Sequence, residues 1–326
     1  MKIAVTGANG HVGSNLCKAL LEKGYQVKAL THRHTKAIQD LPVEFIKGDL
    51  LDKESIRFLL QDADYCFHLA AYISIKGDPD GMVWRSNAEG TRNMVEVARE
   101  QRIKRFIHFS SIHAFQQQPV QEPIDEARPL VSSKGFAYDR SKAEGERAVH
   151  QAASNGLDTI ILSPTAIIGP ADPEPSLAGK ALLGLYHRQI PALVPGGYNW
   201  VDVRDVVSGA INAITMGRAG EKYLLSGTWY SLLDLARLVE KVTRSKTTQT
   251  VMPMWMAKLG LPFIALYSHI TGGEPLYTNE SLQIITEGNR NISNEKARQE
   301  LNFSTRELEE TIRDVFSWFR EKGFIR

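Results

Sequence analysis

The chain of 326 residues is 43% hydrophobic and 23% charged, which indicates a folded globular protein and excludes a disordered one. Its 39 Lys and Arg nearly balance its 37 Asp and Glu, giving a formal net charge of +2. Such a balance leaves no long-range field for binding nucleic acid or an acidic membrane. The length favours one large α/β domain with a smaller appended lobe.

Cysteine and histidine usage narrows the class of protein. Cys17 and Cys66 fall in a predicted helix and a predicted strand, which gives no disulfide framework and suits a reducing cytoplasm. The nine histidines lack ligand spacing with cysteines or acids, so we expect no metal site. The first residues carry no secretion signal, and the apolar segment 255–267 is too short to span a bilayer. We expect a cytoplasmic protein without an integral membrane segment, and leave open a contact of this segment with a membrane surface.

Short apolar runs alternate with longer amphipathic stretches in the first half of the chain. The predicted strands are 3–5, 27–30, 43–46, 65–69, 106–109 and 159–162, and the predicted helices between them are 11–23, 53–60, 86–101 and 137–155. This alternation is typical of βαβ units, whose right-handed crossovers place helices on both faces of a parallel sheet. It predicts an α/β fold with a Rossmann-type doubly wound sheet that binds ligands at the carboxyl ends of its strands.

After Pro164 the pattern loosens, and Gly and Pro residues near 169–170 and 195–197 mark loops. Helices are expected at 231–243, 253–267, 294–301 and 305–321, and one further strand at 222–225 that returns to the main sheet. We expect residues 1–165 to form the Rossmann-type domain and residues 166–326 to form a smaller, mostly helical lobe.

A glycine-rich segment follows the first strand and opens the first helix. It reads Thr6-Gly7-Ala8-Asn9-Gly10-His11-Val12-Gly13. Gly7 would permit a tight turn, Gly10 would let the backbone approach a pyrophosphate, and Gly13 would let the helix pack closely on the strand. The unpaired amides at the helix start would hold the anion. The segment predicts a dinucleotide site formed by Gly7, Asn9, Gly10, His11, Val12 and Gly13.

The end of the second strand usually distinguishes NAD from NADP. In NAD sites an acidic residue there accepts hydrogen bonds from the ribose 2′-hydroxyl. Here the strand ends Leu30-Thr31-His32-Arg33-His34 without an acid, and a guanidinium would pair with a 2′-phosphate. The sequence therefore favours NADP, with His32 and Arg33 as phosphate ligands. Further cofactor contacts are expected by position from Asp49, Leu50, Leu69, Ala70 and Ala71.

Three side chains form the candidate catalytic group. Tyr138 and Lys142 are four residues apart in a predicted helix, so both project from one face. Lowering a phenol pKa by about three units toward neutrality requires roughly 4 kcal/mol, much of which a nearby ammonium supplies. The phenol would then exchange a proton with a carbonyl or alcohol oxygen. Ser111, just past the fifth strand and preferred over Ser110, would hydrogen-bond the same oxygen.

With these motifs in place, the sequence resembles the extended short-chain dehydrogenase/reductase family over essentially its whole length. The resemblance rests on segments 6–13, 48–50, 68–71, 87–91, 109–111, 138–142, 164–170 and 201–206. It implies that Lys142 also bonds the nicotinamide ribose and that Asn87 supports the helix behind the site. It further implies that residues 1–165 bind NADP(H), with Ser110, Pro164, Thr165, Ala166 and Ile167 among the cofactor contacts.

Three features distinguish branches of that family. Ser163 precedes Pro164, where the sugar-nucleotide epimerases commonly carry arginine. Together with the missing acid near Arg33 and the apolar C-terminal lobe, this looks more like the dihydroflavonol reductase and 3-beta-hydroxysteroid dehydrogenase branch. Aromatic and methionine side chains of the lobe suit an apolar ketone or aldehyde, although such residues are more often ordinary core. Candidate substrate contacts are Tyr72, His113, Tyr186 and Trp200, and Phe263 and Tyr267 are further aromatic residues of the lobe.

Three functions remain open on sequence grounds. The favoured one is an NADP(H)-dependent oxidoreductase that reduces a carbonyl group of a lipophilic or aromatic small molecule, or oxidises the alcohol. The second is a nucleotide-sugar epimerase or dehydratase with tightly bound NAD(P), and the third is a cofactor-binding regulatory protein without turnover. A homodimer through the helices near 86–101 and 137–155 is typical of related proteins, whereas some relatives in the reductase branch are monomers.

Overall fold

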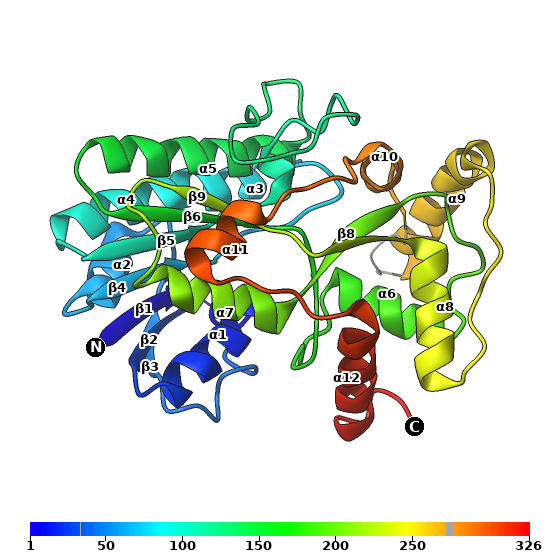
Figure 1. Cartoon of the computed structure of the whole chain (residues 1–326), viewed down its shortest axis with the longest axis horizontal. Helices are drawn as coiled ribbons and strands as arrows, with labels where there is room; N and C mark the ends of the chain where they lie inside the picture. The colour runs from blue at the N-terminus through cyan, green and yellow to red at the C-terminus, as the bar shows by residue number, and fades with distance from the viewer. Residues whose placement is uncertain (33, 272–276) are drawn as a thin grey trace.

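The computed structural model describes residues 1–32, 34–271 and 277–326, with residues 263–271 described by their backbone alone. Its centre is one sheet of parallel strands (Figure 1). The strands are β1 (Lys2–Thr6), β2 (Gln26–Thr31), β3 (Glu44–Lys47), β4 (Tyr65–His68), β5 (Arg105–Phe109), β6 (Thr159–Pro164) and β9 (Lys222–Leu225). Their order across the sheet is β3-β2-β1-β4-β5-β6-β9.

The strand order reverses at β1. The chain starts there, adds β2 and β3 on one side, and then returns to place β4 on the other side, where Ile3 pairs with Tyr65. A parallel sheet with such a reversal has a crevice outside the carboxyl ends of the two central strands, and ligands bind there. The strand expected at 222–225 is β9, which joins the sheet by pairing in parallel with β6.

Helices cover both faces of this sheet, as Figure 1 shows. One face carries α1 (His11–Glu22), α7 (Val203–Ala213) and α11 (Glu295–Leu301), and the other carries α2 (Lys53–Leu60), α4 (Gly90–Glu100) and α5 (Ala137–Ser154). Ile3 and Val5 pack toward α1 while Ala4 packs toward α2 and α4, so successive residues of β1 all point into apolar cores. Burial on both faces explains why the strands read as continuous apolar runs.

The segment expected as one helix over 86–101 has three parts. It consists of α3 (Met82–Trp84), the π-helical turn η1 (Arg85–Glu89) and α4. The wider π turn holds Asn87 almost wholly buried. Such turns are rare and often lie at functional sites, and here the turn lies beside α5.

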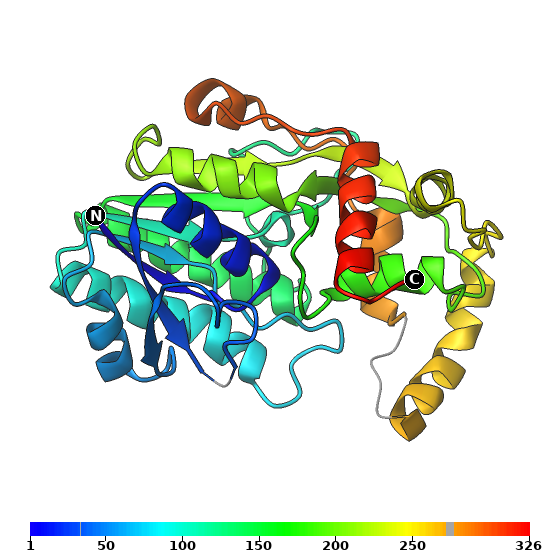
Figure 2. The same cartoon turned by 90° about the horizontal axis from the view of Figure 1, so that it is seen from below.

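The C-terminal half builds a lobe at the end of the molecule opposite the N-terminus (Figures 1 and 2). A small sheet with the order β10-β8-β7 lies at its base, with β7 (Ala166–Ile168), β8 (Gly197–Asp202) and β10 (Thr228–Ser231). Its helices are α6 (Leu177–Tyr186), α8 (Leu232–Thr243), α9 (Met254–Thr271), α10 (Asn279–Glu287) and α12 (Leu308–Glu321). Among the described residues, no helix is both long and apolar enough to cross a membrane.

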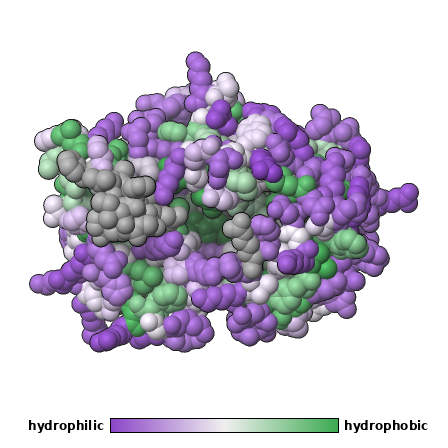
Figure 3. Space-filling view, turned by 180° about the vertical axis from the view of Figure 1, so that it is seen from behind, coloured by the Kyte–Doolittle hydropathy of each residue, from purple (hydrophilic) through white to green (hydrophobic). Residues whose placement is uncertain are grey.

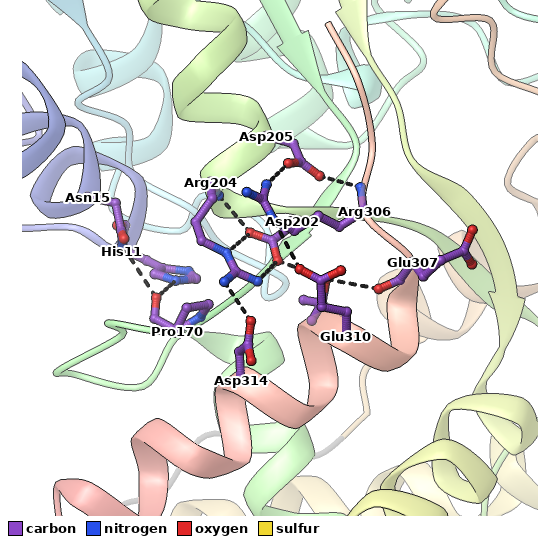
Figure 4. Close-up of polar contacts among 11 residues, drawn as sticks. His11, Asn15, Pro170, Asp202, Arg204, Asp205, Arg306, Glu307, Glu310 and Asp314 are labelled. Atoms are coloured by element: carbon purple, nitrogen blue, oxygen red, sulfur yellow. Dashed lines mark hydrogen bonds and ion pairs between the residues drawn. The ribbon is translucent and has the colours of Figure 1, made fainter.

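A charged cluster fastens the lobe to the main sheet (Figure 4). Asp202, at the end of β8, caps α7 through the amide of Arg204 and also accepts two hydrogen bonds from the Arg204 guanidinium, at 2.9 and 2.7 Å. The same guanidinium donates to Asp314 of α12 at 2.6 Å, and Thr311 of α12 donates to Asp202 at 2.8 Å. The start of α7, which covers the main sheet, is thereby joined to the last helix of the lobe.

Candidate active site

The glycine loop has a geometry that only glycine fits at two positions. Gly7 has φ +71°, and a Cβ atom there would lie 2.7 Å from the backbone nitrogen of Ala70 at the end of β4. A Cβ atom on Gly13 would lie 2.1 Å from the carbonyl oxygen of Gly7. Gly10 begins α1 without any side-chain cap, which leaves amides of the first turn for an anion. The loop therefore fits the pyrophosphate of a dinucleotide.

Side chains around the loop fix it to its neighbours. The Asn9 side-chain oxygen accepts a hydrogen bond from the Ala37 amide at 2.8 Å, and the His11 ring nitrogen Nε2 lies 3.1 Å from the carbonyl oxygen of Pro170 (Figure 4). Asn15, one turn into α1, donates to the carbonyl oxygen of Ala171 at 3.1 Å. The side chains of Asn9 and His11 are thus engaged within the chain, and Val12 packs against the core. Cofactor contacts of Asn9, His11 and Val12 stay a prediction.

The ends of β2 and β3 bring an acid beside His32. His32 Nε2 lies 3.5 Å from the Asp49 carboxylate, and both side chains are about half exposed. Arg33 lies outside the described residues. The neighbourhood of Asp49 and His32 was not expected from the sequence, because the two residues belong to different strands that meet only in the sheet.

The remaining expected cofactor contacts lie along the carboxyl edge of the sheet. Leu69 and Ala70 follow β4, with both amides bonded to Thr6 at 3.2 Å. Pro164 ends β6, and the Thr165 hydroxyl donates to the Asn199 side chain at 3.0 Å before β7 begins. Ala71 is exposed and Ala166 and Ile167 are partly exposed at this edge, whereas Leu50 is buried.

Ser111, Tyr138 and Lys142 come together at the same edge. Ser111 follows β5. Its hydroxyl accepts a hydrogen bond from the amide of His113 at 3.2 Å, and it lies close enough to the Tyr138 phenol to oppose the rise of the phenol pKa. Tyr138, near the start of α5, is partly exposed. Lys142, one turn later, is buried and donates to the Phe109 carbonyl oxygen at 2.5 Å. The arrangement brings a phenol, a hydroxyl and an ammonium to the carboxyl edge of the sheet, with the ammonium turned to the Phe109 carbonyl.

The electrostatics of these groups differ from the expectation. Burial raises the pKa of Tyr138 to about 12, although the hydrogen bond from Ser111 opposes this shift. Burial also lowers the pKa of Lys142 to about 8, against the opposing charge of Glu146. The expected lowering of the phenol pKa toward neutrality is therefore absent from the chain alone, because the ammonium is turned to the Phe109 carbonyl while the phenol is desolvated.

A buried histidine joins the glycine loop to the helices behind the site. His68 Nδ1 lies 2.7 Å from the Thr6 hydroxyl, and its Nε2 lies 2.9 Å from the Thr91 hydroxyl. The Thr6 hydroxyl oxygen accepts a hydrogen bond from the Ala70 amide, so the hydroxyl proton is free to be donated to His68 Nδ1. The Thr91 hydroxyl donates its proton to the Asn87 carbonyl oxygen, so it must accept a hydrogen bond from His68 Nε2. This accounting assigns the neutral Nε2–H tautomer. It agrees with burial, which lowers the pKa of His68 to about 3.

The chain of hydrogen bonds continues to the catalytic helix. The Asn87 amide group donates to the Ser141 hydroxyl at 2.9 Å, and Ser141 donates to the carbonyl oxygen of Tyr138 at 2.7 Å. Asn87 also bonds both backbone groups of Tyr72, at 2.7 and 3.0 Å. Asn87 therefore braces α5 from behind, which is the role the resemblance implied, and it holds the loop after β4.

Glu146 is a further buried group that the sequence analysis passed over. Its side chain is fully buried on α5 and accepts a hydrogen bond from the Ser110 hydroxyl at 2.8 Å. Ser110 is thus turned to the interior while Ser111 faces Tyr138. The signal was present in the sequence, because Glu146 follows Lys142 by four residues and so shares its helix face.

The candidate substrate residues fall into two groups. Tyr72 is 47% exposed, and the His113 ring lies edge-on to Tyr138 with centroids 6.0 Å apart, so both are near the site. Tyr186 and Trp200 instead pack in the core of the lobe. The Tyr186 hydroxyl donates to the Arg326 carbonyl oxygen at 3.4 Å. The side chains of Phe263 and Tyr267 lie outside the described residues. Figure 3 shows one face hollowed near its middle, with hydrophobic side chains at the bottom.

Comparison with known proteins places the chain in a family. The NAD dependent epimerase/dehydratase family matches residues 3–226. The chain belongs to this family. It is 32% identical to sterol demethylase protein B of Methylococcus capsulatus, over 100% of both chains. It is 31% identical, over 99% of this chain and 95% of the relative, to a Synechocystis sp. protein whose name carries dihydroflavonol 4-reductase as a provisional activity.

Other relatives agree with this assignment. A 2-alkyl-3-oxoalkanoate reductase of Stenotrophomonas maltophilia is 31% identical over 69% of this chain and 70% of its own length. The crystal structure of gox2253 superposes with a TM-score of 0.85 at 30% identity, covering 100% of this chain and 99% of that one. UDP-glucuronic acid 4-epimerase from Bacillus cereus shares the fold, with a TM-score of 0.78 at 20% identity over 99% of this chain and 100% of that one. The chain is thus an NAD(P)-dependent oxidoreductase of the extended short-chain type.

Proposed function

We propose that the chain reduces the carbonyl group of a lipophilic or aromatic ketone or aldehyde with NADPH, or oxidises the corresponding alcohol with NADP⁺. The observation that carries this proposal is the Tyr138 phenol, beside Ser111 and one helical turn before Lys142 at the carboxyl edge of the sheet. The reductases among the relatives support a carbonyl substrate.

Each of the three residues has a task in this reaction. The bound nicotinamide supplies the hydride for the carbonyl carbon. Tyr138 is protonated at neutral pH, because burial raises its pKa to about 12, and it therefore has a proton to give to the carbonyl oxygen. The Ser111 hydroxyl stabilises negative charge developing on that oxygen. Lys142 carries a positive charge below its pKa of about 8, which favours the phenolate left after proton transfer.

An apolar substrate fits the surroundings better than a nucleotide sugar does. The hollow in Figure 3 has a hydrophobic bottom. Ser163, at the position where epimerases of the family commonly carry arginine, is fully buried in β6 and offers no charge to a diphosphate. Tyr72 and His113 are the described side chains that we assign to substrate contact, because the His113 ring lies edge-on to Tyr138 and the Tyr72 backbone is held by Asn87, which also bonds α5.

A panel of aromatic and aliphatic ketones and aldehydes tests the proposal directly. With NADPH and the purified chain, at least one compound should give stoichiometric loss of the reduced-nicotinamide absorbance. Tyr138→Phe should lower kcat by about 10²- to 10⁴-fold because it removes the proton donor, while NADPH binding persists. Tyr25→Phe is the matched control, since Tyr25 lies at the amino-terminal edge of the sheet, just before β2, and should leave turnover unchanged.

The competing functions predict different results. A nucleotide-sugar epimerase would retain its cofactor through purification and interconvert sugars without net NADPH consumption. A cofactor-binding regulator would bind NADPH and turn over none of the panel. Either result, with the folded protein in hand, would contradict the proposed reduction.

A further inference from the structure

The most heavily buried charged group near the site is not one of the three catalytic candidates. Glu146 has no exposed surface, and it lies one helical turn after Lys142 and two turns after Tyr138 on α5. Acidic side chains are almost never fully buried unless they are paired. A fully buried carboxylate on α5 therefore needs charged or hydrogen-bonding partners, and its burial calls for a functional explanation.

Three side chains from three elements face the Glu146 carboxylate. The Ser110 hydroxyl at the end of β5 donates to Oε2 at 2.8 Å, the Lys222 ammonium of β9 donates to Oε1 at 3.2 Å, and His150 Nε2 lies 3.8 Å from Oε1. Burial acts to raise the pKa of Glu146, but interactions with His150, Lys222 and Ser110 outweigh it, so the net pKa is lowered. Glu146 is ionised at neutral pH.

Among the groups that face Lys142, Glu146 supplies the negative charge that offsets the cost of burying the Lys142 ammonium. His68 of β4 and His108 of β5 lie near the ammonium, and burial keeps both neutral by lowering their pKa values. Lys142 itself donates to the neutral carbonyl of Phe109. Glu146 is the group whose charge opposes the loss of the Lys142 proton.

We propose that Glu146 is a positioning residue that keeps Lys142 charged and holds Ser110 inward, so that the next residue, Ser111, faces Tyr138. The two effects reach the site by separate routes, one through space to the ammonium and one through the hydrogen bond to the end of β5. Lys222 completes the arrangement, because its ammonium compensates part of the Glu146 charge while lying 4.7 Å from the centre of the Phe115 ring. This inference concerns the same site and rests on the proposed function for its catalytic meaning.

The charge on Lys142 can be titrated without any substrate. In protein labelled with ¹³C at lysine Cε, the Lys142 signal is identified by its absence from Lys142→Met, and its shift is followed against pH with and without NADP⁺. Glu146→Gln should lower the titration midpoint by about one to three pH units, the effect expected on losing a nearby opposite charge. Glu144→Gln is the matched control, because it removes the same charge two residues away, where Glu144 pairs with Arg92 and Arg147 at the surface.

A second variant tests the sign of the effect. Lys222→Met leaves the Glu146 charge less compensated and should raise the Lys142 midpoint or leave it in place, whereas general damage to the helix would lower it in both variants. If Glu146→Gln does not fold, Glu146→Asp should fold and keep the midpoint near that of the parent. A folded Glu146→Gln with an unchanged midpoint, or a fall in Lys222→Met equal to that in Glu146→Gln, overturns the proposal.

The hydrogen-bond route has its own readout once a carbonyl substrate is in hand. Ser110→Ala should lower kcat/KM several-fold without moving the Lys142 midpoint, and Glu146→Gln should also shift the alkaline limb of the kcat/KM profile to lower pH. An unchanged kcat/KM in Ser110→Ala overturns this route. Failure of the ketone panel would contradict the proposed function and leave the titration result intact, so the two failures are distinguishable.

Discussion

Gly13 shows at the scale of one residue how the backbone, and not a side chain, builds the cofactor loop. The first turn of α1 lies so close to Gly7 that a methyl group on Gly13 would sit 2.1 Å from a carbonyl oxygen. Backbone atoms on both sides leave no flexible neighbour to move aside. The shape of the anion site therefore requires glycine at position 13.

We expect Gly13→Ala to destabilise the fold by about 1 to 3 kcal/mol, the usual cost of overpacking, and to abolish NADPH binding because the loop must shift. Thermal unfolding and fluorescence titration with NADPH measure the two effects. Gly260→Ala in α9 is the control, since no atom lies within 4 Å of a Cβ at that position and alanine favours helix. Retained NADPH affinity in Gly13→Ala would show that the loop tolerates a side chain.

The three candidate catalytic residues illustrate what the sequence reveals about single positions. The four-residue spacing of Tyr138 and Lys142 was enough to put them on one helix face, and the strand end was enough to select Ser111. The pKa of the Tyr138 phenol could not be predicted from the sequence. It depends on how far the fold buries the phenol and on the Phe109 carbonyl, which accepts the hydrogen bond of the Lys142 ammonium. Burial and backbone acceptors are properties of the assembled site.

At the scale of elements, the Asp202 cluster joins the start of α7 to α12. Burial raises the pKa of Asp202, but hydrogen bonds from Arg204 and Thr311 outweigh it and leave the pKa below its usual 3.8. A carboxyl group whose folded pKa is depressed contributes stability above its unfolded pKa. That stability is lost as the pH falls below about 4 and through the folded pKa.

Asp202→Asn should therefore lower the free energy of unfolding at pH 7 by about 3 kcal/mol, as expected when one partner of a buried pair is removed. Its loss of stability between pH 5 and pH 3 should be smaller than that of the parent, because the titrating group is gone. Urea unfolding at several pH values measures both. Glu22→Gln removes an exposed partner of Lys18 at 4.0 Å and should change stability by less than about 0.5 kcal/mol. Parallel acid profiles for parent and Asp202→Asn would assign the acid sensitivity elsewhere.

The elements that the sequence predicted are those with a long local pattern. Strands of the main sheet and helices such as α5 and α12 were found from apolar runs and helical periodicity. The small sheet was missed because β7 has only three residues, β8 begins within the Pro195-Gly196-Gly197 segment that predicted a loop, and the four residues of β10 do not form an apolar run. The π turn before α4 was missed as well, since hydrophobic periodicity does not separate a π turn from the helix that continues it.

At the scale of the whole molecule, cofactor preference should appear in thermal stability. Saturation at one hundred times the dissociation constant stabilises a protein by about 2.7 kcal/mol, or roughly 5 °C for a chain of this size. We expect NADP⁺ to raise Tm by this amount and NAD⁺ to raise it less at the same concentration. Arg33→Ala should reduce the NADP⁺ effect and spare the NAD⁺ effect. A larger shift with NAD⁺ in the parent would make the Asp49 carboxylate beside His32 the deciding group.

The polar chain from Thr6 through His68, Thr91 and Asn87 to Ser141 has a consequence for anyone who engineers this scaffold. Grafting a foreign nucleotide-binding segment onto it would break the chain unless the graft also supplies a threonine at the end of the first strand and a neutral imidazole on the neighbouring strand. Cofactor swaps made only at the ends of β2 and β3 leave that scaffold untouched. Recombination between homologues should accordingly tolerate junctions after residue 141, which keep all five residues from one parent, better than junctions between residues 6 and 68, which divide Thr6 from His68.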